Sequence, residues 1–348
     1  MNAGHAFPLL TIADIARRTG LEESLLRFYE SEYPEHLPAK ILRGDALLFP
    51  EEAVESFLHV NQHHLTGQAD RPAPGRFGRV LAITSGKGGV GKSNLALNLA
   101  IAIQRLDKMC VVVDGDLGLA NIHLLAGIDG RAGIQELLDQ GKTVAEIITP
   151  GPEGIGIISG GSGILALADS RHGERLRLIR ALAEVEQRAD MVIVDTGAGM
   201  GSAVRDLLGA ADELLFVLTP DITSLADAYG LLKALHQENP DLGQRPLYSV
   251  VNMVESLQQA AEVANRFSAC ADRFLGLSVE NIGYLLRDSA VGGATARRTP
   301  YMVFKPQARV SRNTHNVAVA LMGREMANLR ASSAFNRYLK MIDKEKVA

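Results

Sequence analysis

The stretch that decides the fold runs from Val80 to Gln104. It begins with a short apolar run, Val80 to Thr84, continues as Ser85-Gly86-Lys87-Gly88-Gly89-Val90-Gly91-Lys92-Ser93, and ends in the helix-prone segment Asn94 to Gln104. This is the GxxxxGK[ST] pattern in the order strand, loop, helix. Glycines let backbone N–H groups close around phosphate oxygens, and the start of the helix adds a favourable dipole. The stretch therefore predicts a phosphate-binding loop in an α/β protein.

The side chains of this loop predict a bound magnesium nucleotide. Lys92 would neutralise the β and γ phosphates, and the Ser93 hydroxyl would face Mg²⁺. Lys87 is a second cation that an ordinary phosphate-binding loop does not need. Lys87 is either a solvated loop charge or a phosphate contact. The phosphate contact is favoured because two neighbouring lysines repel each other unless a polyphosphate neutralises their charges. The residues expected to contact the nucleotide here are Gly86, Lys87, Gly88, Gly89, Val90, Gly91, Lys92, Ser93 and Asn94.

Further apolar runs along the chain predict the sheet that carries this loop. Each run is followed by a loop and usually by a helical pattern, an order typical of βαβ units. We therefore expect an α/β P-loop NTPase with a mostly parallel sheet covered by helices and a ligand at the carboxyl ends of the strands. The runs after Val80 to Thr84 are Cys110 to Val113, Met191 to Val194, Leu214 to Leu218 and Tyr248 to Val251.

Three acids follow two of these strands. Asp114 and Asp116 end the run that begins at Cys110, and Asp195 ends the run that begins at Met191. A single aspartate after a strand is often only a cap or turn residue. Three of them at one edge of a P-loop sheet instead predict carboxylates that hold the waters of a magnesium ion and orient the attacking water.

The loop with its early lysine, Gly86 to Ser93, resembles the deviant Walker A motif of the MinD/ParA ATPases. The resemblance implies ATP and Mg²⁺ as cofactors and a homodimer that forms around ATP. It also implies that Lys87 and Lys92 contact phosphates, with Lys87 reaching across the dimer to those of the partner. Asp116 would position the attacking water, and Asp114, Asp195 and Ser93 would organise the magnesium shell.

Within this family the chain resembles the FlhG branch, also called FleN or YlxH, which sets flagellar number and placement. The resemblance covers residues 79 to 325 and implies that Asn252 contacts adenine, with Asp288 as a second base contact. Cys110 and Cys270 form no CxxC pair, which excludes the iron-sulfur branches. The stretches that carry the FlhG resemblance are Asp114 to Asn121, Asp195 to Gly199, Gly160 to Gly163, Thr219 to Tyr229, Val251 to Val254 and Pro300 to Gln307.

Residues 1–65 predict a separate, small α-helical, winged-helix-like module. Leu10 to Glu30 resembles the helix-turn-helix of MerR-type regulators, and Gly44 to Glu52 would form its wing. The module could read DNA, dock on a protein or act as a structural cap. Its ten acids and five bases repel a duplex, whose binding rests on phosphate neutralisation, so protein docking is favoured. Residues 66–78 are expected to be a linker and 79–330 the ATPase domain.

Residues 331–348 predict an amphipathic C-terminal tail. Phe335, Tyr338, Leu339 and Ile342 fall on one helical face, with Arg337, Lys340, Lys344 and Lys346 around them. Such a helix either lies on an anionic membrane surface or packs on its own domain, and the sequence leaves both open.

The composition is that of an ordinary globular protein, with 47% hydrophobic and 22% charged residues and a net charge of −4. Because the chain lacks a long apolar run and a secretory signal, we expect it in the cytoplasm or bound peripherally to the inner face of the membrane. The most consistent function is an ATP-dependent dimerisation switch in spatial or numerical control of a cellular structure, flagella first. The alternatives are a transcriptional regulator gated by the ATPase and a ParA-type partition ATPase.

Overall fold

The computed structural model describes the following residues of the chain: 9–19, 21, 23–32, 37–38, 40–43, 46–58, 77–116, 120–128, 133–160, 172–199, 201–323 and 333–345. These residues belong to two compact units, Met1–Asp70 and Arg71–Ala348. Some predicted features fall outside the described residues. They include residues 66–76 of the expected linker, Gly20 and Glu22 of the helix-turn-helix, the wing positions 44–45, positions 117–119 and 161–163, and Lys346 of the tail.

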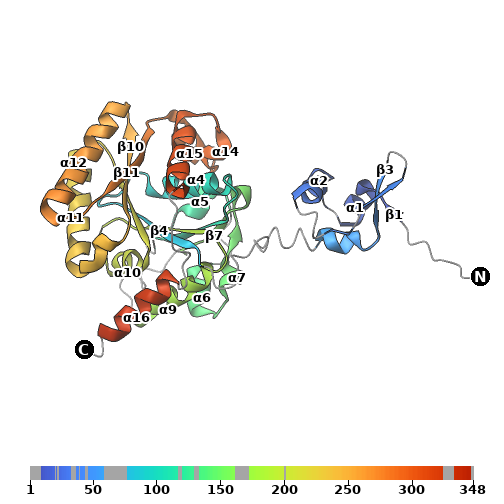
Figure 1. Cartoon of the computed structure of the whole chain (residues 1–348), viewed down its shortest axis with the longest axis horizontal. Coiled ribbons are helices and arrows are strands. Elements are labelled where there is room, and N and C mark those ends of the chain that lie inside the picture. The colour runs from blue at the N-terminus through green and yellow to red at the C-terminus, as the bar shows by residue number, and fades with distance from the viewer. Residues whose placement is uncertain are drawn as a thin grey trace, which may run out of the picture. The chain divides into compact units, whose positions relative to one another are not determined.

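The larger unit is built on a mostly parallel sheet (Figure 1), which confirms the fold class predicted from the sequence. The described strands are, in spatial order, β11 (Glu280–Leu286), β10 (Leu247–Val254), β9 (Glu213–Leu218), β4 (Arg79–Thr84), β8 (Met191–Thr196), β5 (Cys110–Gly115), β7 (Gly156–Ile158) and β6 (Thr149–Pro150). Among these neighbours, only β6 and β7 pair antiparallel. All five predicted strands are present, and β6, β7 and β11 are additional.

Alternation along the strands creates two hydrophobic cores, one on each face of the sheet. In β4, Leu81 and Ile83 face one core, while Val80 and Ala82 face the other. The first core contains α4 (Lys92–Gln104) and α15 (Arg309–Met322). The second contains α9 (His172–Val185), α10 (Ser202–Ala210), α11 (Ile222–Glu238), α12 (Leu257–Leu275) and α16 (Ala334–Glu345).

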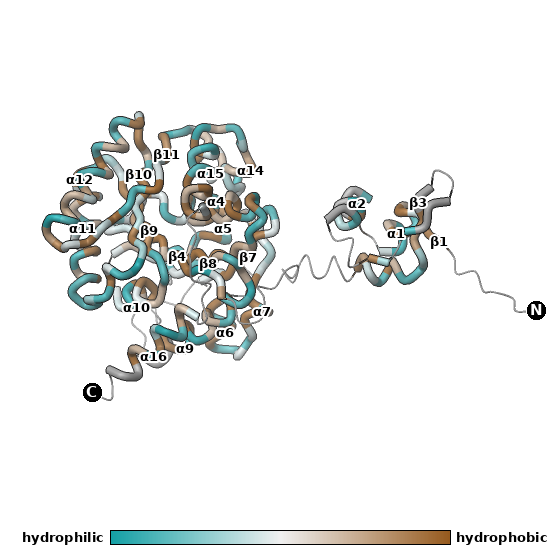
Figure 2. The backbone as a smooth tube through the Cα atoms, viewed as in Figure 1, coloured by the Kyte–Doolittle hydropathy of each residue, from teal (hydrophilic) through white to brown (hydrophobic). Residues whose placement is uncertain are grey.

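The helix that follows the phosphate-binding loop, α4, lies deeper than an ordinary surface helix. It is mostly hydrophobic along its length (Figure 2) and is buried on nearly all sides. In contrast, α12 alternates buried and exposed positions. The remaining described helices are α5 (Ile122–Ala126), α6 (Ile134–Asp139), α7 (Val144–Ile147), α13 (Ser289–Ala296), α14 (Tyr301–Phe304), and the short 3₁₀ helices η2 (Pro152–Gly154) and η3 (Pro240–Gln244).

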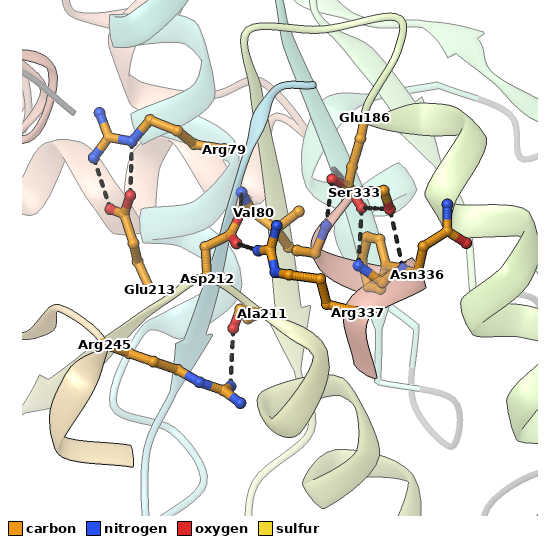
Figure 3. Close-up of polar contacts among 12 residues, drawn as sticks. Arg79, Val80, Glu186, Ala211, Asp212, Glu213, Arg245, Ser333, Asn336 and Arg337 are labelled. Atoms are coloured by element: carbon orange, nitrogen blue, oxygen red, sulfur yellow. Dashed lines mark hydrogen bonds and ion pairs between the residues drawn. The ribbon is translucent and has the colours of Figure 1, made fainter. Parts of the chain in front are cut away.

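The C-terminal helix α16 is fixed to the domain at its first turn (Figure 3). Glu186 accepts hydrogen bonds from Ser333 Oγ at 2.5 Å, Ala334 N at 2.8 Å and Phe335 N at 3.0 Å. A helix start has unpaired N–H groups, and a buried carboxylate satisfies them while matching the helix dipole. Glu186 therefore acts as a cap supplied by a segment far away in the sequence.

Further along α16, its apolar face packs on the domain. Phe335, Leu339 and Ile342 are buried in the core beside α9 and α10. Arg337 forms an ion pair with Asp212, which also accepts a hydrogen bond from Val80 N (Figure 3). Of the two arrangements left open by the sequence, this structure has the one in which the tail covers its own domain. No described helix is long and apolar enough to cross a membrane.

The smaller unit combines two helices with a small sheet. It contains β1 (Leu9–Leu10), α1 (Ile12–Thr19), α2 (Glu23–Glu32), β2 (Ile41–Arg43), β3 (Ala46–Pro50) and a helical segment at residues 53–58. The strands pair antiparallel in the order β1-β3-β2. The rings of Phe49 and Phe57 pack edge to face with their centroids 5.6 Å apart, in a core that also contains Ile15, Leu26 and Tyr29. The sheet gives this unit more strand content than the α-helical module expected.

Candidate functional site

The loop after β4 needs glycine for both conformation and space. Gly89 and Gly91 have φ values of 77° and 94°, a region that L side chains rarely adopt. A Cβ on Gly86 would lie 2.1 Å from the backbone carbon of Asp227 in α11. The loop is therefore held against α11 at its start and turns tightly into α4 at its end.

Lys92 lies inside the site, at the first position of α4. Its side chain is buried, and its Nζ donates to Ser85 Oγ at 3.1 Å. Burial lowers the pKa of Lys92, and the nearby Asp195 and Asp116 oppose that effect. A buried ammonium with so few partners is suited to a phosphate, which would supply both charge and acceptors.

Asp114 and Asp195 are direct neighbours across β5 and β8. Both are buried, and burial raises the pKa of each to about 7, an effect that Asp195 strengthens at Asp114. Asp114 accepts hydrogen bonds from Asn121 N and Ile122 N at 2.9 Å each and from Asp116 N at 3.3 Å. It therefore shapes the loop after β5 as well as adding charge.

Asp195 has the features of a metal-site carboxylate. It is hydrogen-bonded to the Ser93 side chain, and its Oδ1 is buried without a hydrogen-bond partner. Carboxylate and hydroxyl oxygens suit Mg²⁺, which keeps several of its waters. No cluster of three His, Cys, Asp or Glu side chains suited to a metal occurs in the described part of the chain. The residues present therefore fit a magnesium ion held partly by water and by the nucleotide.

These carboxylates predict a pH effect on stability. The folded pKa of Asp195, about 7, is above its ordinary value of 3.8, so the folded state binds more protons and becomes less stable as pH rises from about 4 to about 7. Asp195→Asn removes this titration. Without nucleotide at pH 8, the variant is expected to have a higher melting temperature than wild type, by about 2–4 °C for each kcal/mol of unfolding free energy that the buried charge costs. Melting curves from pH 5 to 8 test this, and parallel pH profiles would contradict it.

Asp116 lies at the same end of the sheet. A Cβ added to Gly197 would lie only 3.4 Å from Asp116 Oδ1, so the two residues are close neighbours. The charge of Asp116 also acts on Lys92 and Asp195. The structure thus brings together four residues that the sequence predicted for one site: Lys92, Asp114, Asp116 and Asp195.

A cavity of about 320 Å³ opens beside the phosphate-binding loop. Asn252 is not among the residues that line the cavity, but it contacts two that are: its Nδ2 donates to Val90 O at 2.8 Å, and its Oδ1 accepts from Met253 N at 2.8 Å. Met253, near the end of β10, has a φ of 60°. The lining residues are Lys87, Gly88, Gly89, Val90, Thr219, Pro220, Asp221, Met253, Glu255, Gln259 and Arg287.

Several of these residues were not predicted from the sequence. Glu255 and Arg287 form an ion pair at 2.8 Å that joins the segments after β10 and β11. Asp288, expected as a second base contact, caps α13, accepting from Ala290 N at 2.9 Å, and it is not among the residues that line the cavity. Its neighbour Arg287 is the residue of that segment that reaches the cavity.

Lys87 lies at the rim, apart from Lys92. Its Nζ is 2.6 Å from Asp221 Oδ2 and donates to Thr223 Oγ1 at 2.9 Å. Its side chain is 43% exposed, in contrast to the buried Lys92. The two lysines of the loop therefore have different surroundings.

Comparisons with known proteins agree with this geometry. An AAA domain family model matches residues 78–242. The antiactivator FleN of Pseudomonas aeruginosa is 32% identical over 234 residues, 67% of this chain and 82% of FleN. The flagellum site-determining protein YlxH of Helicobacter pylori is 29% identical, with 76% of this chain and 90% of YlxH covered.

Solved structures show the same fold. The septum site-determining protein MinD from Pyrococcus horikoshii, complexed with Mg-ADP, gives a TM-score of 0.59 at 21% identity, covering 70% of this chain and 95% of that one. The cell division ATPase MinD from Pyrococcus furiosus gives a TM-score of 0.60 at 20% identity, and the match covers 71% of this chain and 99% of that one.

Proposed function

Because this chain belongs to the MinD/ParA family of P-loop ATPases, we propose that it is a nucleotide-dependent dimerisation switch with ATP and Mg²⁺ as cofactors. The observation that carries the proposal is the different placement of the two lysines. Lys92 faces the phosphate site from inside, whereas Lys87 is at the accessible rim, where a second chain can approach. Closure of the dimer would follow ATP binding, and hydrolysis would reopen it.

Each residue of the site has a separate role in ATP binding or hydrolysis. Bound Mg-ATP supplies the phosphoryl group and the charge that the site is suited to hold. The loop amides and Lys92 bind phosphate oxygens, and Ser93 and Asp195 orient the magnesium shell. Asp116 orients the attacking water, while Asp114 fixes the loop on which Asp116 lies. Asn252 holds the end of β10 against the loop, where the base would bind.

We further propose that the switch controls flagellar number or placement. The names of FleN and YlxH, at 32% and 29% identity, support this process. The test is to delete the gene in its own organism, count flagella by electron microscopy, and restore the wild type or Asp116→Ala. An altered count that only the wild type restores is expected. A normal count and normal placement in the deletion strain would contradict the proposal.

Residues 1–65 are expected to dock on a protein surface, either of a partner or of an ATPase domain. Among the bases whose side chains the structure describes, three pair with acids: Arg17 with Asp14 at 2.5 Å, Arg18 with Glu51 at 3.0 Å, and Lys40 with Glu30 at 2.8 Å. A base that is already paired with an acid contributes less to neutralising the phosphates of a DNA backbone. The rival function, a DNA-binding regulator, is favoured by one observation, the two helices followed by a β-hairpin.

Removal of residues 1–70 therefore should change the affinity for random or genomic DNA by less than about twofold at ~150 mM salt. Fluorescence anisotropy with the full chain and the shortened chain measures this. Sub-micromolar, sequence-selective binding by the full chain that disappears in the shortened chain would instead support the regulator. We expect the protein in the cytoplasm; peripheral membrane contact through the tail would require Phe335, Leu339 and Ile342 to leave the core.

A further inference from the structure

Lys87 is held within its own chain by a fixed carboxylate. Asp221 is the N-cap of α11, and its Oδ1 accepts a hydrogen bond from Thr223 N at 3.1 Å. Its Oδ2 accepts from Thr223 Oγ1 at 3.0 Å and from Lys87 Nζ at 2.6 Å. The Lys87 side chain lowers the pKa of Asp221 to about 2. The acceptor is therefore ionised at neutral pH and oriented by the start of a helix.

The backbone of the loop is fixed against the same helix. Gly86, next to Lys87, packs on the backbone of Asp227 one and a half turns further along α11. Two contacts therefore hold this part of the loop against α11: the ion pair between Lys87 and Asp221, and the packing of Gly86 on Asp227. Lys87 and Asp221 also line the cavity beside the loop, so a nucleotide bound there would lie next to the pair.

From this geometry we propose that Asp221 is a positioning residue that holds Lys87 within its own chain and so sets how readily the ATP-bound dimer closes. This inference rests on the proposed dimerisation switch. Two of the three ammonium donors of Lys87 are already used on Asp221 and Thr223. Lys87 must give up these contacts before it can bind a phosphate of a second chain, so Asp221 competes with that phosphate.

The size of the competition is modest because both side chains are partly exposed, 43% for Lys87 and 45% for Asp221. Exposed ion pairs of this kind contribute little, which corresponds to about a twofold to fivefold change in an equilibrium constant. The competition therefore adjusts the threshold for dimer formation without preventing it.

Asp221→Asn tests the inference because asparagine caps a helix as well as aspartate does but carries no charge. With Mg-ATP, the dimer dissociation constant of this variant, measured by sedimentation, is expected to fall by about fourfold to 25-fold, because each of the two chains contributes one such pair. ATP affinity is measured separately, below the dimerisation concentration, so that dimer formation is compared at equal occupancy by ATP. Asp241→Asn, an exposed acid on η3 outside the cavity, is the matched control and should behave as wild type.

A second measurement needs no dimer. In the nucleotide-free protein, acetylation of Lys87 followed by mass spectrometry should be faster in Asp221→Asn than in wild type, while Lys233 on α11 reacts equally in both.

The outcomes separate the inference from the proposed function. Unchanged Lys87 reactivity, or a dimer that is unchanged or weakened by Asp221→Asn, overturns the inference while the switch stands. If neither wild type nor any variant dimerises with ATP, both the proposed function and the inference that rests on it are contradicted.

Discussion

Lys92→Ala is expected to abolish ATP binding, whereas Lys87→Ala should keep binding and lose the dimer. Lys92 is buried beside Asp195 and Asp116, and in the proposed site it would be the main counter-charge for the phosphates. Removing one partner of a buried charge pair has a large effect, so we expect ATP affinity to fall by at least about 100-fold. Lys87 is exposed at the rim, and its loss should change the affinity of one chain for ATP by less than about threefold.

Calorimetry on both variants measures ATP affinity, and light scattering measures the dimer. Because Lys92→Ala removes the cation beside the buried Asp195, its melting curve must first show that the protein is folded. A folded Lys92→Ala protein that binds ATP as wild type would contradict the site. A Lys87→Ala protein that still dimerises with ATP would contradict the role of Lys87 across the dimer.

Asp116→Ala is expected to slow ATP hydrolysis by about 100-fold or more while ATP affinity is kept. Orientation and activation of the attacking water contribute factors of this size, and Asp116 is not expected to hold a phosphate oxygen. A phosphate-release assay at saturating Mg-ATP measures the rate, and Asp139→Ala, an exposed acid on α6, is the control. Hydrolysis by Asp116→Ala at the wild-type rate would mean that another residue orients the water.

The parts of the fold predicted from the sequence are those with local patterns. Continuous apolar runs are typical of strands buried on both faces, so β4, β5, β8, β9 and β10 were predictable. The strand β11 was not, because it lies at the edge of the sheet and interrupts its apolar residues with Asn281 and Gly283. Its composition alone does not distinguish it from a loop.

The features missed from the sequence are contacts between distant segments. The pair formed by Glu255 and Arg287 appears only when β10 and β11 lie side by side. Likewise, no local pattern in the sequence joins Lys87 to Asp221, or Glu186 to the start of α16. Loop glycines and carboxylates at strand ends indicate the chemistry of a site, but its rim depends on which loops the sheet places together.

The central claim, that ATP closes a dimer, is tested most directly by the molar mass of Asp116→Ala, measured by light scattering after size-exclusion chromatography. The slow hydrolysis of this variant should preserve the ATP state during the measurement. With Mg-ATP we predict the mass of two chains, and with Mg-ADP the mass of one. The mass of one chain with both nucleotides, in a variant that calorimetry shows to bind ATP, would contradict the account.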